Sequence, residues 1–165
     1  MSDEPPVNAE VQPLSSINTD DDTIFNQPNG NDWFLATLVQ YANIGIEIPV
    51  TLSVSGSTIS GHLIGGRAFF EELEKSIKGG TATADPGVDP QEFLIGLAET
   101  LGEYREIYAV KNDESWAENI SKPHFVHLRG ARVVATGGVP VPGDGLLWRG
   151  KASSVDGVAV GAIVY

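Results

Sequence analysis

Four basic side chains near the C-terminal end of the chain are the residues whose type and spacing best suit chemistry. Arg149 and Lys151 are two positions apart in a predicted strand, so they share one face, while Trp148 points to the other. Arg129 and Arg132 come from the preceding strand region and can lie beside them. Basic groups next to an aromatic ring can hold phosphates, as they do in nucleic-acid modules. The same groups can instead pair with carboxylates.

The distribution of charge helps to decide between phosphate binding and pairing with carboxylates. The net charge is −12, yet residues 122–165 contain five bases and two acids, while residues 1–46 contain seven acids and no base. A basic strand region in an acidic molecule attracts acidic parts of the same chain, of a sister subunit or of a partner. A protein of this charge repels a polyanion unless its basic patch is well isolated, so we expect no nucleic-acid partner. The candidate partner-binding residues are Arg129, Arg132, Arg149 and Lys151.

Other side chains offer no catalytic centre. The chain has no cysteine, which excludes disulfides, zinc–thiolate sites and cysteine nucleophiles. His124 and His127 point to opposite faces of a predicted strand and His62 stands alone, so we interpret all three as structural or surface residues. The carboxylates lack the spacing of a calcium loop, and no serine lies in a nucleophile elbow. We expect neither an enzyme nor a metal or other cofactor.

An acidic tail is expected to precede the folded part. Residues 1–30 contain four prolines and few large apolar side chains, so they bury too little surface to offset the entropy of ordering, and we expect disorder. Residues 31–165 are expected to form a single domain. No window approaches the roughly 18 apolar residues of a membrane span, and the acidic start is unlike a secretory signal. We therefore expect a cytoplasmic protein with no membrane partner.

Two hydrophobic periodicities predict the first elements of this domain. A helix begins with Asn31 or Asp32 as its cap and ends at Gly45. Alternating apolar and polar residues over 50–54 and 59–64 then predict a pair of strands joined by a turn.

A helical, acidic insertion is expected over about residues 66–121. Its first helix ends at Gly79–Gly80. Its second helix starts with Asp89 as cap and Pro90 at the first position. The buried stripe of this second part is predicted to consist of Phe93, Leu97, Leu101, Tyr104 and Tyr108.

The C-terminal part is predicted to return to strands. Residues 124–138 form one strand region, residues 139–145 a loop, and residues 146–165 a final hairpin that turns at Asp156–Gly157. Short strands with glycine corners favour strong bending over a flat sheet. The predicted fold class is α+β, mainly β: a small, strongly bent five-stranded Sm/SH3-like barrel with an N-terminal helix and a helical insertion.

The order of elements resembles the Sm-like fold. VTLSVSGSTISGHLI stands early in the chain and LLWRGKASSVDGVAV late. Arg149–Gly150 resembles the second Sm motif, in which the arginine and a neighbouring asparagine hold a nucleobase. Lys151 stands where Asn or Asp is usual, and HLRGAR lacks the asparagine of the family. The resemblance implies, as an alternative function, an Sm-like module that binds single-stranded RNA.

A second resemblance is more specific. LSVSGSTISGHLIGGRAFFEEL, HFVHLRGARVV and LLWRGKASSVDGVAVGAIV are similar, in order and wording, to the gas vesicle accessory protein U (GvpU) family, over about residues 46–78 and 122–165. The resemblance implies a non-enzymatic cytoplasmic protein that acts in gas vesicle assembly or clustering through protein–protein contacts. Its partners would be the gas vesicle shell or other gas vesicle proteins. Exposed edge strands of the barrel would pair copies into a homo-oligomer.

Overall fold

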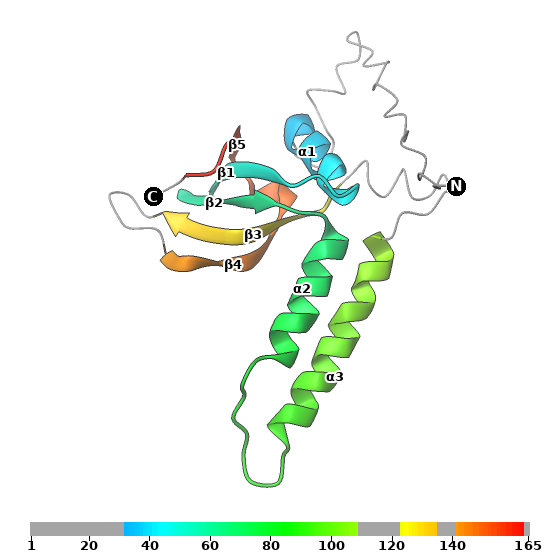
Figure 1. The fold of residues 1–165 in the computed structure, drawn as a ribbon. Coiled ribbons are helices and arrows are strands. Elements are labelled where there is room, and N and C mark those ends of the chain that lie inside the picture. Colours follow the sequence, from blue (N-terminus) through cyan, green and yellow to red (C-terminus); the bar gives the residue numbers. More distant parts are fainter. Residues whose placement is uncertain (1–31, 109–122, 135–140, 164–165) are drawn as a thin grey trace, which may run out of the picture.

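The structure, a computed structural model, describes residues 32–108, 123–134 and 141–163. Its elements follow in the order α1, β1, β2, α2, α3, η2, β3, β4, η3 and β5. In Figure 1, α1 lies against one side of a sheet, and a hairpin of two helices, α2 and α3, projects away from that sheet. The expected tail, residues 1–30, lies outside the described residues.

Five strands form one antiparallel sheet. They are β1 (Ile48–Val54), β2 (Ser57–Leu63), β3 (Phe125–Val134), β4 (Val141–Lys151) and β5 (Gly157–Val160), in the order β4-β3-β2-β1-β5. The predicted α+β, mainly β class is therefore confirmed. Each of β4 and β5 has one neighbour among the described strands, so the sheet is open between them. The predicted Sm/SH3-like barrel is not confirmed, because this sheet is not closed.

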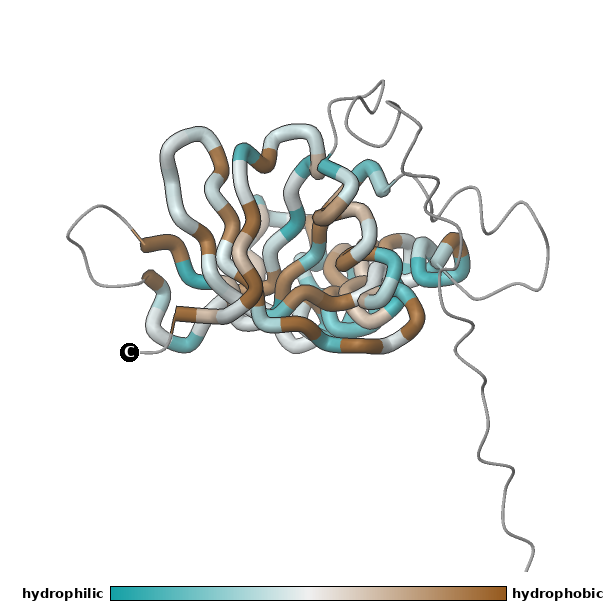
Figure 2. Tube along the Cα trace, turned by 90° about the horizontal axis from the view of Figure 1, so that it is seen from above, coloured by the Kyte–Doolittle hydropathy of each residue, from teal (hydrophilic) through white to brown (hydrophobic). Residues whose placement is uncertain are grey.

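The main core lies between α1 (Trp33–Asn43) and the sheet. Asp32 caps the helix, as predicted, because its Oδ1 accepts a hydrogen bond of 3.0 Å from the Phe34 backbone N–H. The core is apolar throughout, and Figure 2 shows hydrophobic stretches along the strands that supply it. Its fully buried members include Leu35 of α1, Val50 and Leu52 of β1, Leu63 of β2, and Val126 and Leu128 of β3.

The β1–β2 hairpin is confirmed where the alternation predicted it. Ser55 and Gly56 form its turn with positive φ angles of 49° and 80°. Gly56 adopts this left-handed conformation without a steric penalty. The carboxylate of Asp156 accepts a hydrogen bond of 2.6 Å from the Ser55 N–H, which ties the turn to the segment that leads into β5.

The predicted helical insertion begins with a hairpin of α2 (Gly66–Lys78) and α3 (Pro90–Glu103), followed by the 3₁₀ helix η2 (Tyr104–Tyr108). The predicted start of α3 is confirmed. Asp89 Oδ1 accepts hydrogen bonds from the backbone N–H groups of Gln91 at 2.8 Å and of Glu92 at 3.3 Å, and Pro90 is the first residue of the helix. The predicted end of α2 at Gly79 is also confirmed.

The predicted final hairpin is wrong. β5 pairs with β1, at the opposite edge of the sheet from β4. The short 3₁₀ helix η3 (Ala152–Ser154) redirects the chain after β4, and the Asp156 N–H donates to the Ser53 carbonyl at 2.8 Å, which sets β5 against β1. The predicted loop over residues 139–145 is also partly wrong, because β4 already begins at Val141.

Candidate functional site

Arg129 links β3 to α2 and to the segment that precedes β1, on the face of the sheet that α2 covers. Its guanidinium donates hydrogen bonds to Glu72 of α2 and to Glu47, which precedes β1. These two carboxylates raise the pKa of the Arg129 side chain further above its usual range, with the Glu72 bond as the largest cause. The expected pairing of a basic residue with the chain's own acids is thus confirmed at Arg129.

The other three basic candidates have different surroundings. The Nε–H of Arg132 donates to the Gly143 carbonyl at 2.8 Å. A break in the β3–β4 register, with Gly130 at a φ of 60°, separates Arg132 from the pair formed by Arg149 and Lys151. Arg149 and Lys151 are both exposed, so the structure gathers two of the four candidates at the surface.

The side chain of Arg149 extends over the neighbouring strand β3. It lies directly across from His127 of β3, and its guanidinium carbon is 3.4 Å from the centre of the Phe125 ring. This is the geometry of a cation–π contact. No carboxylate forms an ion pair with Arg149 within the described parts of the chain, so an acidic group of a partner can pair with it.

His127 is buried in an aromatic cluster beneath α2 and η2. Its side chain is 1% exposed, and its ring centre lies 4.6 Å from that of Phe69 and 5.6 Å from that of Tyr108. Burial, helped by the positive charge of Arg149, lowers the pKa of His127 to about 4. The imidazole is therefore neutral at pH 7, and its Nε2 has no hydrogen-bond partner in the described structure. The structural role that we predicted for this histidine agrees with its burial.

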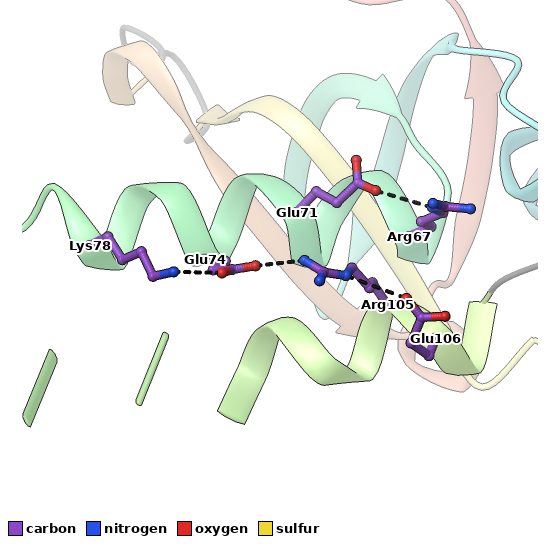
Figure 3. Close-up of polar contacts among 6 residues, drawn as sticks. All are labelled: Arg67, Glu71, Glu74, Lys78, Arg105 and Glu106. Atoms are coloured by element: carbon purple, nitrogen blue, oxygen red, sulfur yellow. Dashed lines mark hydrogen bonds and ion pairs between the residues drawn. The ribbon is translucent and has the colours of Figure 1, made fainter. Parts of the chain in front are cut away.

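A chain of ion pairs runs along the helical hairpin (Figure 3). Glu74 of α2 accepts hydrogen bonds of 2.8 Å from Lys78 and of 2.8 Å from Arg105 of η2. Its pKa is lowered chiefly by the hydrogen bond from Lys78, which more than offsets the effect of burial. Nε of Arg105 also lies 3.5 Å from Oε1 of Glu106. This network fastens η2 to α2.

An apolar groove lies where the hairpin meets the sheet. Its volume is about 400 Å³. Five of its six lining side chains are aromatic or aliphatic, and the sixth is a cation. They are Phe69, Phe70 and Leu73 of α2, Leu101 of α3, Tyr104 of η2 and Arg149 of β4. We call this feature the groove. An apolar cleft with one charged group can hold an apolar side chain that has an acidic neighbour.

Comparison with known families identifies the chain. A family model described as gas vesicle protein GvpU-like matches residues 32–163, from the cap of α1 to beyond β5. The chain belongs to the GvpU-like family. Comparisons with curated proteins and with solved structures each give no match. Membership in the GvpU-like family makes this a gas vesicle-related protein.

In this GvpU-like chain, the outer side of α3 is an apolar surface. Phe93 is 63% exposed and Tyr104 is 47% exposed, so the predicted buried stripe is wrong at these two positions. The residues of α3 that are fully buried against α2 are the small ones, Ala98 and Gly102. The prediction failed because the hairpin projects from the sheet and only one side of α3 meets another element.

Sequence reasoning did not find the groove of this GvpU-like protein. Its lining comes from α2, α3 and η2 and from β4, a strand more than 30 residues further along the chain, and no local pattern joins them. One signal in the sequence could have indicated it. The insertion contains two helices, α2 and α3, that each carry an apolar stripe, and only one of these stripes can face the sheet.

Two searches of the described residues found nothing. No three histidine or carboxylate side chains among them lie close enough to hold a metal ion. None of the described helices has both the length and the hydropathy to span a membrane.

Proposed function

We propose that this GvpU-like chain is a non-enzymatic, cytoplasmic gas vesicle accessory protein. It acts in vesicle assembly or clustering through protein–protein contacts, with the gas vesicle shell or another gas vesicle protein as its partner. The family match over residues 32–163 carries the proposal. The exposed surface of the sheet and hairpin supports it, because these surfaces expose apolar side chains that a partner can cover.

The two edges of the sheet are the surfaces that support self-association. β4 and β5 each present an unpaired edge in the described structure, and such edges readily pair with another chain. Both edges also carry exposed large apolar residues: Val141 is 64% exposed, Leu146 57% and Val160 60%. In the proposed function these edges join copies into a homo-oligomer, and the resulting multivalency lets weak contacts hold vesicles together.

Co-flotation tests the vesicle role. Purified protein is mixed with purified gas vesicles, the vesicles are floated by gentle centrifugation, and the floating layer is assayed for the protein. We expect saturable co-flotation, whereas an unrelated acidic protein of similar size stays below. If the GvpU-like protein also stays below, direct vesicle binding is wrong.

In that case the RNA-binding alternative is tested next. Wild type and the double variant Arg149→Glu, Lys151→Glu would be titrated with a single-stranded oligonucleotide at moderate salt. Loss of affinity in the variant would support RNA binding, and no binding by wild type would remove that function. Of the four basic candidates, Arg129 is already paired with Glu47 and Glu72, which leaves it less available to a phosphate.

A further inference from the structure

We propose that the helical hairpin is a self-docking site, in which the outer side of α3 packs antiparallel against the same side of α3 in a second copy. The contact would be made by the α3 stripe, which we define as Phe93, Leu97 and Leu101 of α3 together with Tyr104, the first residue of η2. In this dimer, Phe93 of each copy inserts into the groove of the other. The proposal goes beyond the vesicle role and does not depend on it.

The position of the stripe on α3 supports this contact. At about 100° per residue, all four side chains fall within a sector of roughly 80° on one side of the helix. The small buried residues Ala98 and Gly102 lie on the side that faces α2. Glu99 and Glu103 lie on the remaining, exposed side. The stripe thus runs from the exposed Phe93, past the partly buried Leu97 and Leu101, to the groove.

The spacing of the stripe is self-complementary. A two-fold axis near residues 98–99 places Phe93 of one copy opposite Tyr104 of the other, and Leu97 opposite Leu101, because each pair is then equally far from the axis. A two-fold interface requires this reciprocity. Phe93 and Tyr104 are about 16 Å apart along the helix, so the two Phe93 contacts occupy opposite ends of one interface.

Charge complementarity favours the antiparallel arrangement. The tip of the hairpin, residues 79–92, contains the acids Asp85, Asp89 and Glu92 and no lysine or arginine. The groove at its base contains Arg149, which has no carboxylate partner within the described residues. An antiparallel pair places the acidic tip of one copy, with Asp85 and Asp89, towards Arg149 of the other. A parallel pair would instead place the two acidic tips together.

The test measures self-association of the full chain without vesicles, by sedimentation velocity over a concentration series. The wild-type protein should form a dimer. The dimer of the Phe93→Glu variant should have a dissociation constant that is roughly tenfold higher or more. Ile95→Glu is the matched control, because Ile95 is 42% exposed on the same helix but about 200° around it from Phe93. It should associate like wild type. Both variants change exposed positions, and circular dichroism checks that both remain folded.

Two further variants test the arrangement. Asp85→Arg and Arg149→Glu should each weaken the dimer, and the double variant should recover affinity. Since the chain has no cysteine, Thr100→Cys places a single thiol near the proposed two-fold axis. Under mild oxidation it should form a covalent dimer faster than Ile95→Cys.

Three results would overturn the proposal. Wild type could remain monomeric at high micromolar concentration. Phe93→Glu could associate as tightly as wild type, which would assign self-association to the sheet edges. The two cysteine variants could cross-link at equal rates, which would show that the α3 stripes do not face each other.

Discussion

At the scale of single residues, His127 couples stability to pH. Its pKa is lowered to about 4 in the folded chain and returns to about 6.5 when the chain unfolds. Below pH 6.5 the unfolded chain therefore binds more protons, and stability is lost as the pH falls from 6.5 to 4. Between pH 7 and pH 5 this histidine should cost about 2 kcal/mol of unfolding free energy.

The variant His127→Phe tests this coupling. Phenylalanine suits a cluster that already contains Phe69, Phe70 and Tyr108, and it removes the unpartnered Nε2. Urea unfolding at pH 7 and pH 5 should show a smaller loss of stability for this variant than for wild type. The exposed His62→Gln serves as control and should keep the wild-type loss. Equal losses in wild type and His127→Phe would contradict the assigned role of burial.

At the scale of elements, two glycines should respond oppositely to the same substitution. A Cβ on Gly65, the N-cap of α2, would lie 2.6 Å from the Ala42 carbonyl oxygen at the end of α1. Because the backbone of Ala42 cannot move away without disturbing the end of α1, Gly65→Ala should destabilise the folded chain by about 1–3 kcal/mol. Gly96 lies on the exposed side of α3 and a Cβ there would meet nothing within 4 Å. Gly96→Ala should stabilise by up to about 1 kcal/mol.

Thermal unfolding followed by circular dichroism measures both effects. For a domain of this size, a change of 1 kcal/mol shifts Tm by about 2–4 °C. Tm should therefore fall in Gly65→Ala and rise slightly in Gly96→Ala. A fall in Gly96→Ala would contradict the open surroundings of Gly96, and an unchanged Tm in Gly65→Ala would contradict the close approach of Gly65 to Ala42.

The same elements show how far sequence reasoning reaches. Asp32, Asp89 and the turn at Gly56 were predictable, because caps and tight turns depend on residues within a few positions of one another. The pairing of β5 with β1 was not predictable, because it depends on Asp156 meeting Ser53 and Ser55 across about 100 residues. From the sequence, the local turn signal at Asp156–Gly157 favoured a hairpin over pairing with a distant strand, and that prediction was wrong.

The candidate site shows the same division. The types of its basic residues were visible in the sequence, and the preference for pairing with internal acids was correct at Arg129. The identities of its partners were not visible, since Glu47 lies 82 residues away and Glu72 57 residues away. Periodicity placed Phe93 and Leu97 on one side of α3 but could not show whether that side meets the core or the solvent.

At the scale of the whole molecule, net charge should control clustering. In the proposed clustering role, copies on neighbouring vesicles each carry −12 and repel one another over the Debye length, which falls from about 30 Å at 0.01 M salt to about 8 Å at 0.15 M. The apolar contacts proposed for the sheet edges and the α3 stripe act at much shorter range. Vesicle clustering by this protein, followed by light scattering, should therefore increase as salt is raised over this interval.

A charge variant separates this effect from a general action of salt on vesicles. Replacing Asp20, Asp21 and Asp22 by asparagine changes the net charge from −12 to −9. Because repulsion between like molecules rises with the product of their charges, the variant should cluster vesicles at lower salt than wild type does. Vesicles without the protein provide the baseline. If clustering does not change with salt, or if the variant needs the same salt as wild type, short-range contacts govern clustering and net charge does not.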